Sequence, residues 1–224
     1  MSFSAPDNRL TGMRFKLFVF DMDSTLIDGE TIDVLADAAG KKAEVSKITE
    51  SAMRGEIDFE KSLKLRVSLL RGLKVSDAEV KVSEISIMKG AKELFFYINS
   101  LGGVTAMITC GFDIVAKRVA ENLNIDYAYS NSLISENGVF TGEVSGPLTK
   151  TDSKAEVLEE IISSLNISHE ECIVIGDGAN DICMFEKAGL SVAFNAKPAV
   201  IKAADVYVPG KDLSLLIPVI KDAL

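Results

Sequence analysis

Two pairs of carboxylates follow two apolar runs of the sequence. The run LFVF leads directly into Asp21 and Asp23, whose side chains share a face because residues at i and i+2 of an extended chain point the same way. The later run CIVI leads into a glycine-rich segment that carries Asp177 and Asp181. If these strands lie side by side, four acids crowd one sheet edge and need protonation or a cation to offset their charge. An oxygen-only set of ligands suits Mg²⁺ far better than Zn²⁺.

A hydroxyl and free backbone N–H groups follow a third apolar run. Thr109, Cys110 and Gly111 end this run, and a helical pattern begins near Ile114. A hydroxyl beside successive N–H groups at a helix N-terminus forms a seat for an anion. The alternative is that Thr109 only caps the helix, just as Asp21 or Asp23 could cap a helix after the first strand.

Lys154 completes the set of candidate groups. It lies in the first turn of a helix that the capping box Ser153-x-x-Glu156 predicts. A cation is unfavourable at a helix N-terminus, so Lys154 either faces solvent or serves a nearby negative site. The four acids, Thr109 and Lys154 together indicate phosphate chemistry, in which a cation, a hydroxyl and a lysine all compensate negative charge.

These side chains need a sheet to bring them together. Short apolar runs typical of buried strands alternate with helical patterns, which predicts an α/β fold with a doubly wound, mostly parallel sheet and helices on both faces. Ligands of such sheets bind at the carboxyl ends of the strands. The strand-like runs lie at 15–20, 104–109, 172–176, 190–194 and 205–208.

One stretch interrupts the alternation. Between the first two strand-like runs, about sixty residues show helical patterns punctuated by glycines and the capping box Ser76-x-x-Glu79, with no strand-like run. We interpret this stretch as a helical cap domain over the carboxyl ends of the strands. The predicted division is an α/β core over 14–28 and 89–224, a cap over 29–88 and an N-terminal extension over 1–13.

A hairpin is predicted within 129–145. Asn137-Gly138 lies between two strand-like runs, which is a strong signal for a two-residue β-turn. We expect this hairpin only to trim the sheet edge.

Composition narrows the classes of function. With 224 residues, 47% hydrophobic and 25% charged, the chain is no disordered or fibrous protein. The net charge of −9 has the wrong sign for general binding to nucleic acid or an anionic membrane. No apolar run approaches the roughly 20 residues that span a bilayer, and residues 1–13 lack the apolar core of a secretory signal. We expect a cytoplasmic monomer or homodimer acting on a small molecule.

Cysteine and histidine are too few to carry the chemistry. The three cysteines stand at irregular separations with no C-x-x-C pair, which argues against a disulfide framework and a structural zinc site. The one histidine, His169, falls in Ser-His-Glu-Glu, which is typical of the solvated first turn of a short helix. Carboxylates are therefore the predicted chemical groups.

The motifs, in this order, resemble the haloacid dehalogenase superfamily of phosphohydrolases. D-x-D-x-T begins at Asp21, the hydroxyl is Thr109, the lysine is Lys154, and G-D-x-x-N-D ends at Asp181. The resemblance runs from about Phe15 to the C-terminus.

Within the superfamily, three segments resemble the phosphoserine phosphatase family. They are DMDSTLIDGETID from Asp21, Ser62-x4-Val-Ser-Leu-Leu, and GDGANDICM from Gly176. One departure is visible, since the family pattern Ser-Gly-Gly here reads Thr109-Cys110-Gly111. The side chain of Cys110 thus stands where the family's glycine leaves room, which bears on substrate fit.

The resemblance implies Mg²⁺-dependent hydrolysis of O-phospho-L-serine, as in serine biosynthesis, through an aspartyl-phosphate on Asp21. Asp23 would protonate the leaving oxygen and then deprotonate the attacking water. Asp21, the backbone carbonyl of Asp23, and Asp177 would hold Mg²⁺, with Asp181 orienting that set. The groups implied to contact the phosphoryl group are Thr109, Cys110, Lys154 and Asn180.

The resemblance also implies how the cap selects its substrate. Arg66 lies seven residues after Phe59, hence within about 20° of its direction on a helix. The family pattern assigns Arg66 to the substrate carboxylate, which suits its planar fork, and Glu30 to the ammonium group. Met53 and Phe59 would close the apolar side of the pocket. The alternatives are a core-edge role for Arg66 and ordinary packing for the two apolar residues.

Other functions stay open at this stage. The core motifs specify the reaction and only the cap specifies the substrate, so a related phosphatase or phosphotransferase acting on another small phosphomonoester is one alternative. A non-catalytic module that binds phosphorylated metabolites is another, although such a module has no need of Asp23 as an acid.

Overall fold

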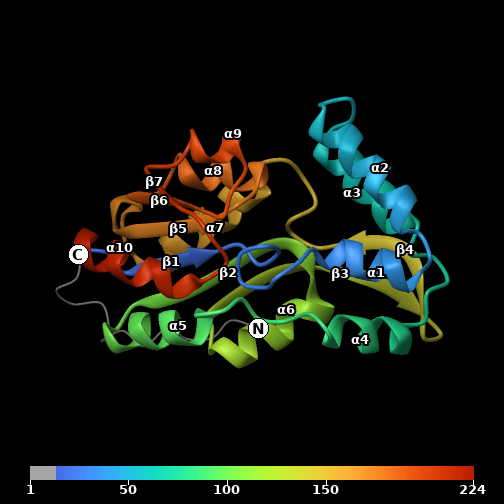
Figure 1. The fold of residues 1–224 in the computed structure, drawn as a ribbon, viewed down its shortest axis with the longest axis horizontal. Coiled ribbons are helices and arrows are strands. Elements are labelled where there is room, and N and C mark those ends of the chain that lie inside the picture. Colours follow the sequence, from blue (N-terminus) through green and yellow to red (C-terminus); the bar gives the residue numbers. More distant parts are fainter. Residues whose placement is uncertain (1–13) are drawn as a thin grey trace.

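The computed structural model describes residues 14–224, so the predicted extension over 1–13 lies outside the described residues. Within 14–224 the chain forms a seven-stranded sheet in the order β4-β3-β2-β1-β5-β6-β7, and every neighbouring pair except β3–β4 is parallel (Figure 1). The predicted doubly wound, mostly parallel α/β fold is confirmed. The strands are β1 (Leu17–Phe20), β2 (Val104–Phe112), β3 (Tyr127–Glu136), β4 (Val139–Ser145), β5 (Cys172–Gly176), β6 (Leu190–Phe194) and β7 (Val206–Val208).

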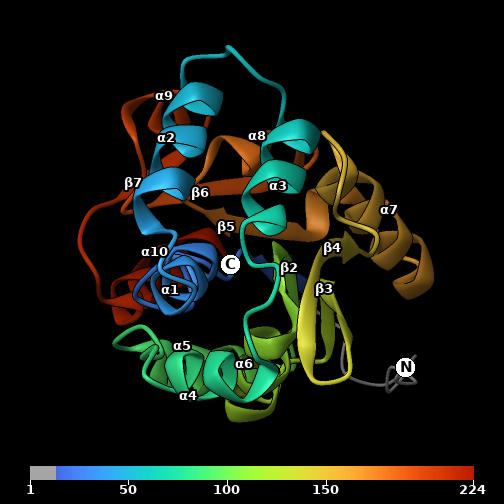
Figure 2. The same ribbon diagram turned by 90° about the vertical axis from the view of Figure 1, so that its right-hand side faces the viewer.

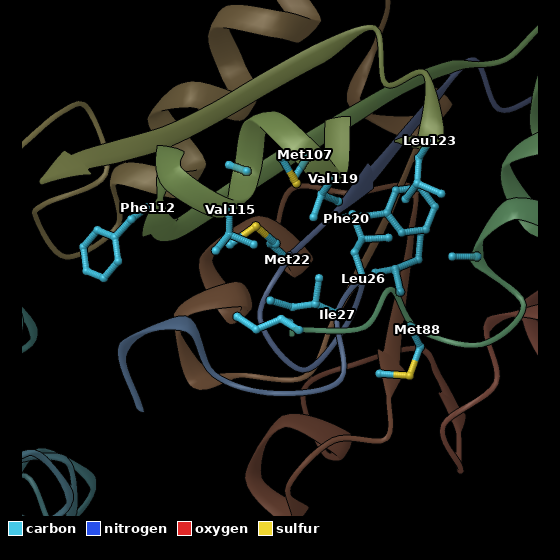
Figure 3. Packing of buried hydrophobic residues seen from close by; sticks show 14 of the residues in the cluster. Phe20, Met22, Leu26, Ile27, Met88, Met107, Phe112, Val115, Val119 and Leu123 are labelled. Carbon is cyan, nitrogen blue, oxygen red and sulfur yellow. The ribbon is translucent and has the colours of Figure 1, made fainter. Parts of the chain in front are cut away.

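The central strand β1 is buried along its whole length between β2 and β5. Phe18 and Phe20 face one apolar cluster, whereas Leu17 and Val19 face the other, because successive side chains of a strand point to opposite faces. Burial on both faces explains why the predicted strands read as continuous apolar runs rather than alternating ones. Figure 3 shows the first cluster, where Phe20 and Met107 lie close to Val119 and Leu123 of the helix that follows β2.

Helices cover both faces of the sheet. The face that carries Phe18 and Phe20 packs against α5, α6 and α10, and the other face packs against α7, α8 and α9 (Figure 1). These helices are α5 (Ala91–Ser100), α6 (Asp113–Leu123), α7 (Ser153–Leu165), α8 (Ile182–Phe185), α9 (Pro198–Ile201) and α10 (Leu216–Ala223), with short 3₁₀ turns η1 (His169–Glu171), η2 (Ala179–Asp181) and η3 (Leu213–Leu215).

Four helices fill the stretch between β1 and α5. Helix α2 packs along α3, and α1 contacts both α2 and α4. Figures 1 and 2 show α2 and α3 side by side beyond the carboxyl ends of the strands, whereas α4 lies in the same layer as α5 and α6. None of the helices in 14–224 has the length and apolarity to cross a membrane. The four are α1 (Thr31–Ala38), α2 (Lys42–Met53), α3 (Phe59–Ser68) and α4 (Val75–Ser83).

Both predicted capping boxes are absent, although helices begin where they were expected. Helix α4 starts at Val75, one residue before the serine that was predicted to cap it, and has no side-chain cap. Helix α7 starts at Ser153, whose hydroxyl donates to the carbonyl of Lys150 at 2.6 Å instead of accepting from its own helix. A capping box does form around η1 between Ser168 and Glu171, and His169 is exposed there as predicted.

The predicted hairpin is present as β3–β4. Asn137 and Gly138 both have positive φ, 51° and 78°, as a type I′ turn requires. The expectation that it only trims the sheet edge is wrong. The hairpin also hydrogen-bonds to the connection between α3 and α4. Gly72 N–H donates to the carbonyl of Phe140 at 2.9 Å, and Phe140 N–H donates to the carbonyl of Leu73.

Adjacent phenylalanines on α5 test the packing of the first cluster. Phe95 is 2% exposed, with its ring centroid 4.8 Å from that of Phe20, whereas Phe96 is 77% exposed. We predict that Phe95→Ala lowers the free energy of unfolding by about 3–5 kcal/mol, since it loses buried area and leaves a cavity. Phe96→Ala should change it by less than about 0.5 kcal/mol. Urea unfolding measures both, and equal effects would contradict the packing described.

Candidate active site

The sheet gathers the predicted carboxylates at one edge. Asp21 follows β1, Asp177 follows β5, and Asp181 ends the 3₁₀ turn η2. One oxygen of each lies within 4.8 Å of the others. Gly176 permits this turn, because a Cβ at that position would meet the Asp181 side chain. Three of the four acids that the two motifs predicted to cluster therefore lie together.

Lys154 lies inside this cluster. Its Nζ is 2.8 Å from Asp21 Oδ1 and 2.7 Å from Asp181 Oδ1, and the residue is 1% exposed, so the alternative of a solvated lysine is wrong. Burial alone would lower the pKa of Lys154, but the two carboxylates raise it well above its usual value. The lysine thus stays charged and holds both partners in fixed positions.

One lysine does not balance the acids around it. Burial, followed by repulsion from Asp181, raises the pKa of Asp21 well above its usual value, and Lys154 opposes this only in part. The same two causes raise the pKa of Asp177 to about 7. The site therefore favours protons or a cation.

The donors at this edge fit a hard divalent cation. They are carboxylate oxygens brought close together, and they lie where negative charge is in excess. Both oxygens of Asp181 are already engaged, Oδ1 with Lys154 and Oδ2 with the N–H groups of Asp177 and Gly178 at 3.1 and 3.0 Å. Asp181 thus fits an orienting role better than direct ligation.

Asp23 is held from the cap side of the edge. Its Oδ1 accepts from Thr31 N at 2.6 Å and from Thr31 Oγ1 at 2.5 Å. Thr31 begins α1, yet the N-cap of that helix is Glu30, so Asp23 reaches a helix start without being its cap residue. Burial, followed by repulsion from Glu30, raises the pKa of Asp23 to about 6. The two hydrogen bonds from Thr31 lower this pKa but do not offset the rise.

The predicted anion seat is a bulge in β2 rather than the cap of α6. The strand runs on to Phe112, past its predicted end at Thr109, and the N-cap of α6 is Phe112. Thr109 Oγ1 instead accepts from Gly111 N at 2.9 Å. A Cβ on Gly111 would meet the Asp23 side chain, so glycine is what lets the bulge approach this acid.

Cys110 fills the position where the family pattern has glycine. It lines a cavity at this edge of the sheet, and its Sγ lies 3.9 Å from the side-chain nitrogen of Asn180. Burial raises the pKa of the Cys110 thiol to about 12, so the thiol stays neutral. The additional side chain packs beside Asn180 rather than acting as a nucleophile.

One cavity of about 840 Å³ unites the predicted residues of core and cap. Asp181 alone among them stays out of the lining, buried against Lys154. The lining includes Asp21, Asp23, Thr109, Cys110, Lys154, Asp177 and Asn180 from the core, and Glu30, Met53, Phe59 and Arg66 from the cap.

The lining that comes from residues 29–88 carries charge of both signs. Arg66 is half-buried, and its Nε donates to the carbonyl of Ser62 one turn earlier at 3.3 Å. Glu30 accepts from Ser24 Oγ at 2.7 Å. Burial lowers the pKa of Arg66 below its usual value. The carboxylates of Glu30 and then Asp33 oppose this shift, so the guanidinium lies in a negative field.

Three polar residues that hydrogen-bond to residues of the site were not predicted from the sequence. Thr25 donates to Asp177 at 3.0 Å, Thr31 donates to Asp23, and Asn131 donates to the carbonyl of Cys110 at 3.1 Å. Thr25 could have been found, since it is the threonine of D-x-D-x-T. Thr31 lies within the segment DMDSTLIDGETID, but no role was assigned to it. Asn131 stands in no motif, and its partners Cys110 and Leu148 are distant in sequence.

Comparisons with known proteins agree on one family. The model of the haloacid dehalogenase-like hydrolases matches residues 18–186. A phosphoserine phosphatase of Methanocaldococcus jannaschii is 44% identical over 206 residues, which cover 92% of this chain and 98% of the relative. A phosphoserine phosphatase of Idiomarina loihiensis is 42% identical, with 92% and 94% covered.

Solved structures lead to the same family. A substrate-bound phosphoserine phosphatase complex matches with a TM-score of 0.88 and 42% identity, covering 93% of this chain and 99% of the other. A phospho-aspartyl intermediate analogue of phosphoserine phosphatase gives the same TM-score and identity, with 92% and 99% covered.

The raised pKa values predict how stability depends on pH without divalent cations. Asp21, Asp23 and Asp177 hold protons in the folded state at pH values where the unfolded state, with a pKa of 3.8, has lost them. The free energy of unfolding should therefore fall as the pH rises from about 5 to 7.

Urea unfolding in EDTA at several pH values measures this slope. The pKa values of Glu56 and Asp212 are lowered to about 2. These two groups therefore change the free energy of unfolding only below the range of pH 5 to 7. Asp177→Asn removes one of the three groups and should flatten the fall. Stability that is constant or rises between pH 5 and 7 would contradict the charge imbalance.

Proposed function

Because the chain belongs to the haloacid dehalogenase-like hydrolase family, we propose that it hydrolyses O-phospho-L-serine to L-serine and phosphate. The observation that carries this proposal is one cavity whose lining includes both the acids and lysine at the sheet edge and Arg66 and Glu30 of the proposed cap. Relatives that match over nearly their whole length are phosphoserine phosphatases, which favours hydrolysis over a phosphotransferase or a non-catalytic binding module.

Asp21 is the proposed nucleophile. Its Oδ1 is fixed by Lys154 at 2.8 Å and by Met22 N–H at 2.7 Å, so the carboxylate is held in one orientation at the cavity wall. Attack of Asp21 on phosphorus breaks the bond to the serine oxygen and forms an aspartyl-phosphate, which divides one difficult step into two. Lys154 and the Thr109 bulge would offset the charge of the phosphoryl oxygens.

Asp23 is the proposed general acid and base. A pKa of about 6 leaves a useful fraction of the carboxyl protonated near neutral pH, as protonation of a leaving alkoxide requires. After serine departs, the same carboxylate would take a proton from the water that hydrolyses the aspartyl-phosphate. The bonds from Thr31 fix its orientation for both steps.

Mg²⁺ is the proposed cofactor. Asp21, the backbone carbonyl of Asp23, and Asp177 would hold it, with Asp181 orienting the set through its bonds to Lys154 and the Asp177 N–H. When bound, Mg²⁺ would supply the positive charge that Lys154 alone cannot, for the acids and for the phosphoryl group.

Residues 29–88 are the proposed cap domain, and this domain would select the substrate. Arg66 would bind the α-carboxylate through its planar fork and Glu30 the α-ammonium group. Met53, which is 64% exposed at the end of α2, would close over the pocket together with Phe59. Closure would exclude water before attack on phosphorus.

A substrate panel tests the proposed function. Phosphate release is measured with Mg²⁺ and with EDTA for O-phospho-L-serine, its D-isomer, phosphothreonine, a sugar phosphate and an aryl phosphate. We expect Mg²⁺-dependent hydrolysis with a strong preference for O-phospho-L-serine. Hydrolysis directed at sugar phosphates would contradict the cap assignment, and no hydrolysis at all would contradict the proposed reaction.

Asp21→Asn should reduce turnover by more than about a thousandfold, since the amide is no nucleophile toward phosphorus. Folding should persist, because Lys154 keeps its bond to Asp181. Asp28→Asn is the matched control, because Asp28 is exposed in the same loop and pairs with Lys211 at the surface. Circular dichroism and steady-state phosphate release measure both, and substantial residual hydrolysis by Asp21→Asn would remove Asp21 as nucleophile.

Arg66→Ala should lower kcat/KM for O-phospho-L-serine by about 100-fold, because a charge-assisted bond to the carboxylate is lost. An aryl phosphate has no such carboxylate, so its hydrolysis should change little. Lys64→Ala, on the exposed side of the same helix, serves as the control and should leave both substrates unaffected. Equal losses for the two substrates would count against a carboxylate-binding role.

A further inference from the structure

Asn131 on β3 connects two segments that carry the proposed phosphate-binding groups. Its side chain is fully buried, and its amide makes three hydrogen bonds. Nδ2 donates to the carbonyl of Cys110 at 3.1 Å and to that of Leu148 at 2.9 Å, while Oδ1 accepts from Leu148 N–H at 3.0 Å. Each polar atom of the amide is thus used.

The bond to Cys110 compensates for a break in the sheet. Ile108 pairs with Tyr129, and the next pair is Phe112 with Asn131, so four steps along β2 match two along β3. Residues 109–111 therefore bulge out of the ladder, where a partly buried carbonyl needs a donor from outside the strand pairing. Asn131 supplies that donor to the middle residue of the bulge.

The bonds to Leu148 fix the segment that leads to Lys154. The side-chain amide exchanges an N–H and a C=O bond with Leu148, as one strand does with another, and Leu148 is itself fully buried. The backbone at Gly146 presses against the same side chain, since a Cβ there would meet Asn131 Oδ1. Four residues after Leu148, Asp152 precedes α7, whose first turn carries Lys154.

We propose that Asn131 is a positioning residue that holds the 109–111 bulge and the 148–154 segment at a fixed separation, so that both bind one phosphoryl group. This inference rests on the proposed function. The amide suits the role because it offers two donors and an acceptor from one planar group, whereas a carboxylate of the same size offers acceptors only.

Asn131→Asp is the most informative variant. It keeps the volume and the acceptor for Leu148 N–H, but places an oxygen against the carbonyls of Cys110 and Leu148. We expect kcat/KM to fall about 10- to 100-fold, equally for O-phospho-L-serine and an aryl phosphate, since the phosphoryl group is common to both. The affinity for orthovanadate should weaken by a similar factor.

Thr105→Val is the matched control. Thr105 is buried at the opposite end of the β2–β3 pair, where its hydroxyl donates to Asp126 Oδ2 at 3.1 Å. It should lower stability without changing kcat/KM or vanadate affinity per folded molecule. If Asn131→Asp behaved in the same way, with lower stability and unchanged kinetics, the positioning role would be overturned.

Two further outcomes keep the test decisive. If Asn131→Asp does not fold, Asn131→Ser is measured in the same way, and wild-type vanadate affinity in the folded serine variant would overturn the proposal. If the wild-type protein bound orthovanadate but hydrolysed no phosphoserine, the proposed function would fail. A loss of vanadate binding in Asn131→Asp would then still support the role of Asn131.

Discussion

The constraint on which this structure depends is the negative charge at the carboxyl edge of the sheet. Parallel pairing of β1 with β5 places Asp21 and Asp177 at the same sheet edge, and an oxygen of Asp181 lies within 4.8 Å of an oxygen of each. Buried like charges repel strongly unless they are compensated, so the edge requires the buried cation of Lys154 and favours protons or a metal ion. The same excess of negative charge that destabilises the folded state surrounds the proposed nucleophile Asp21, the proposed acid Asp23 and the proposed phosphoryl site.

The rest of the fold keeps these groups in place. Two apolar faces hold the central strands rigid, and glycines at 111 and 176 let backbone approach the acids where any side chain would collide. Hydrogen bonds from residues outside this edge orient the acids. Thr31, at the start of α1, orients Asp23 in this way. Thr31 of the proposed cap thus contacts the proposed acid directly, and the hairpin β3–β4 hydrogen-bonds to the α3–α4 connection, so hydrogen bonds link residues 29–88 to the sheet in two places.

How much the sequence could predict depended on whether the signal was local. Strands β5 and β6 match their predicted bounds because buried, mostly apolar runs end abruptly at polar turns. The four acids and Lys154 were found because motif order placed them at the same edge. The bulge in β2, the role of Asn131 and the bonds of the hairpin to the cap were missed, since each depends on a partner distant in sequence. The capping box at Ser153 failed because the hydroxyl makes another local bond, to the carbonyl of Lys150 three residues earlier.

The most direct test of the central claim is to find where the phosphoryl group resides during turnover. The protein would be mixed with O-phospho-L-serine and Mg²⁺, quenched in acid within the first turnover and analysed by peptide mass spectrometry. A carboxylate held by Lys154 at the cavity wall should carry the phosphoryl group, so we expect the mass of one phosphoryl group added at Asp21. A phosphoryl group on another residue, or turnover without any phosphorylated peptide, would contradict the assignment of Asp21 as nucleophile.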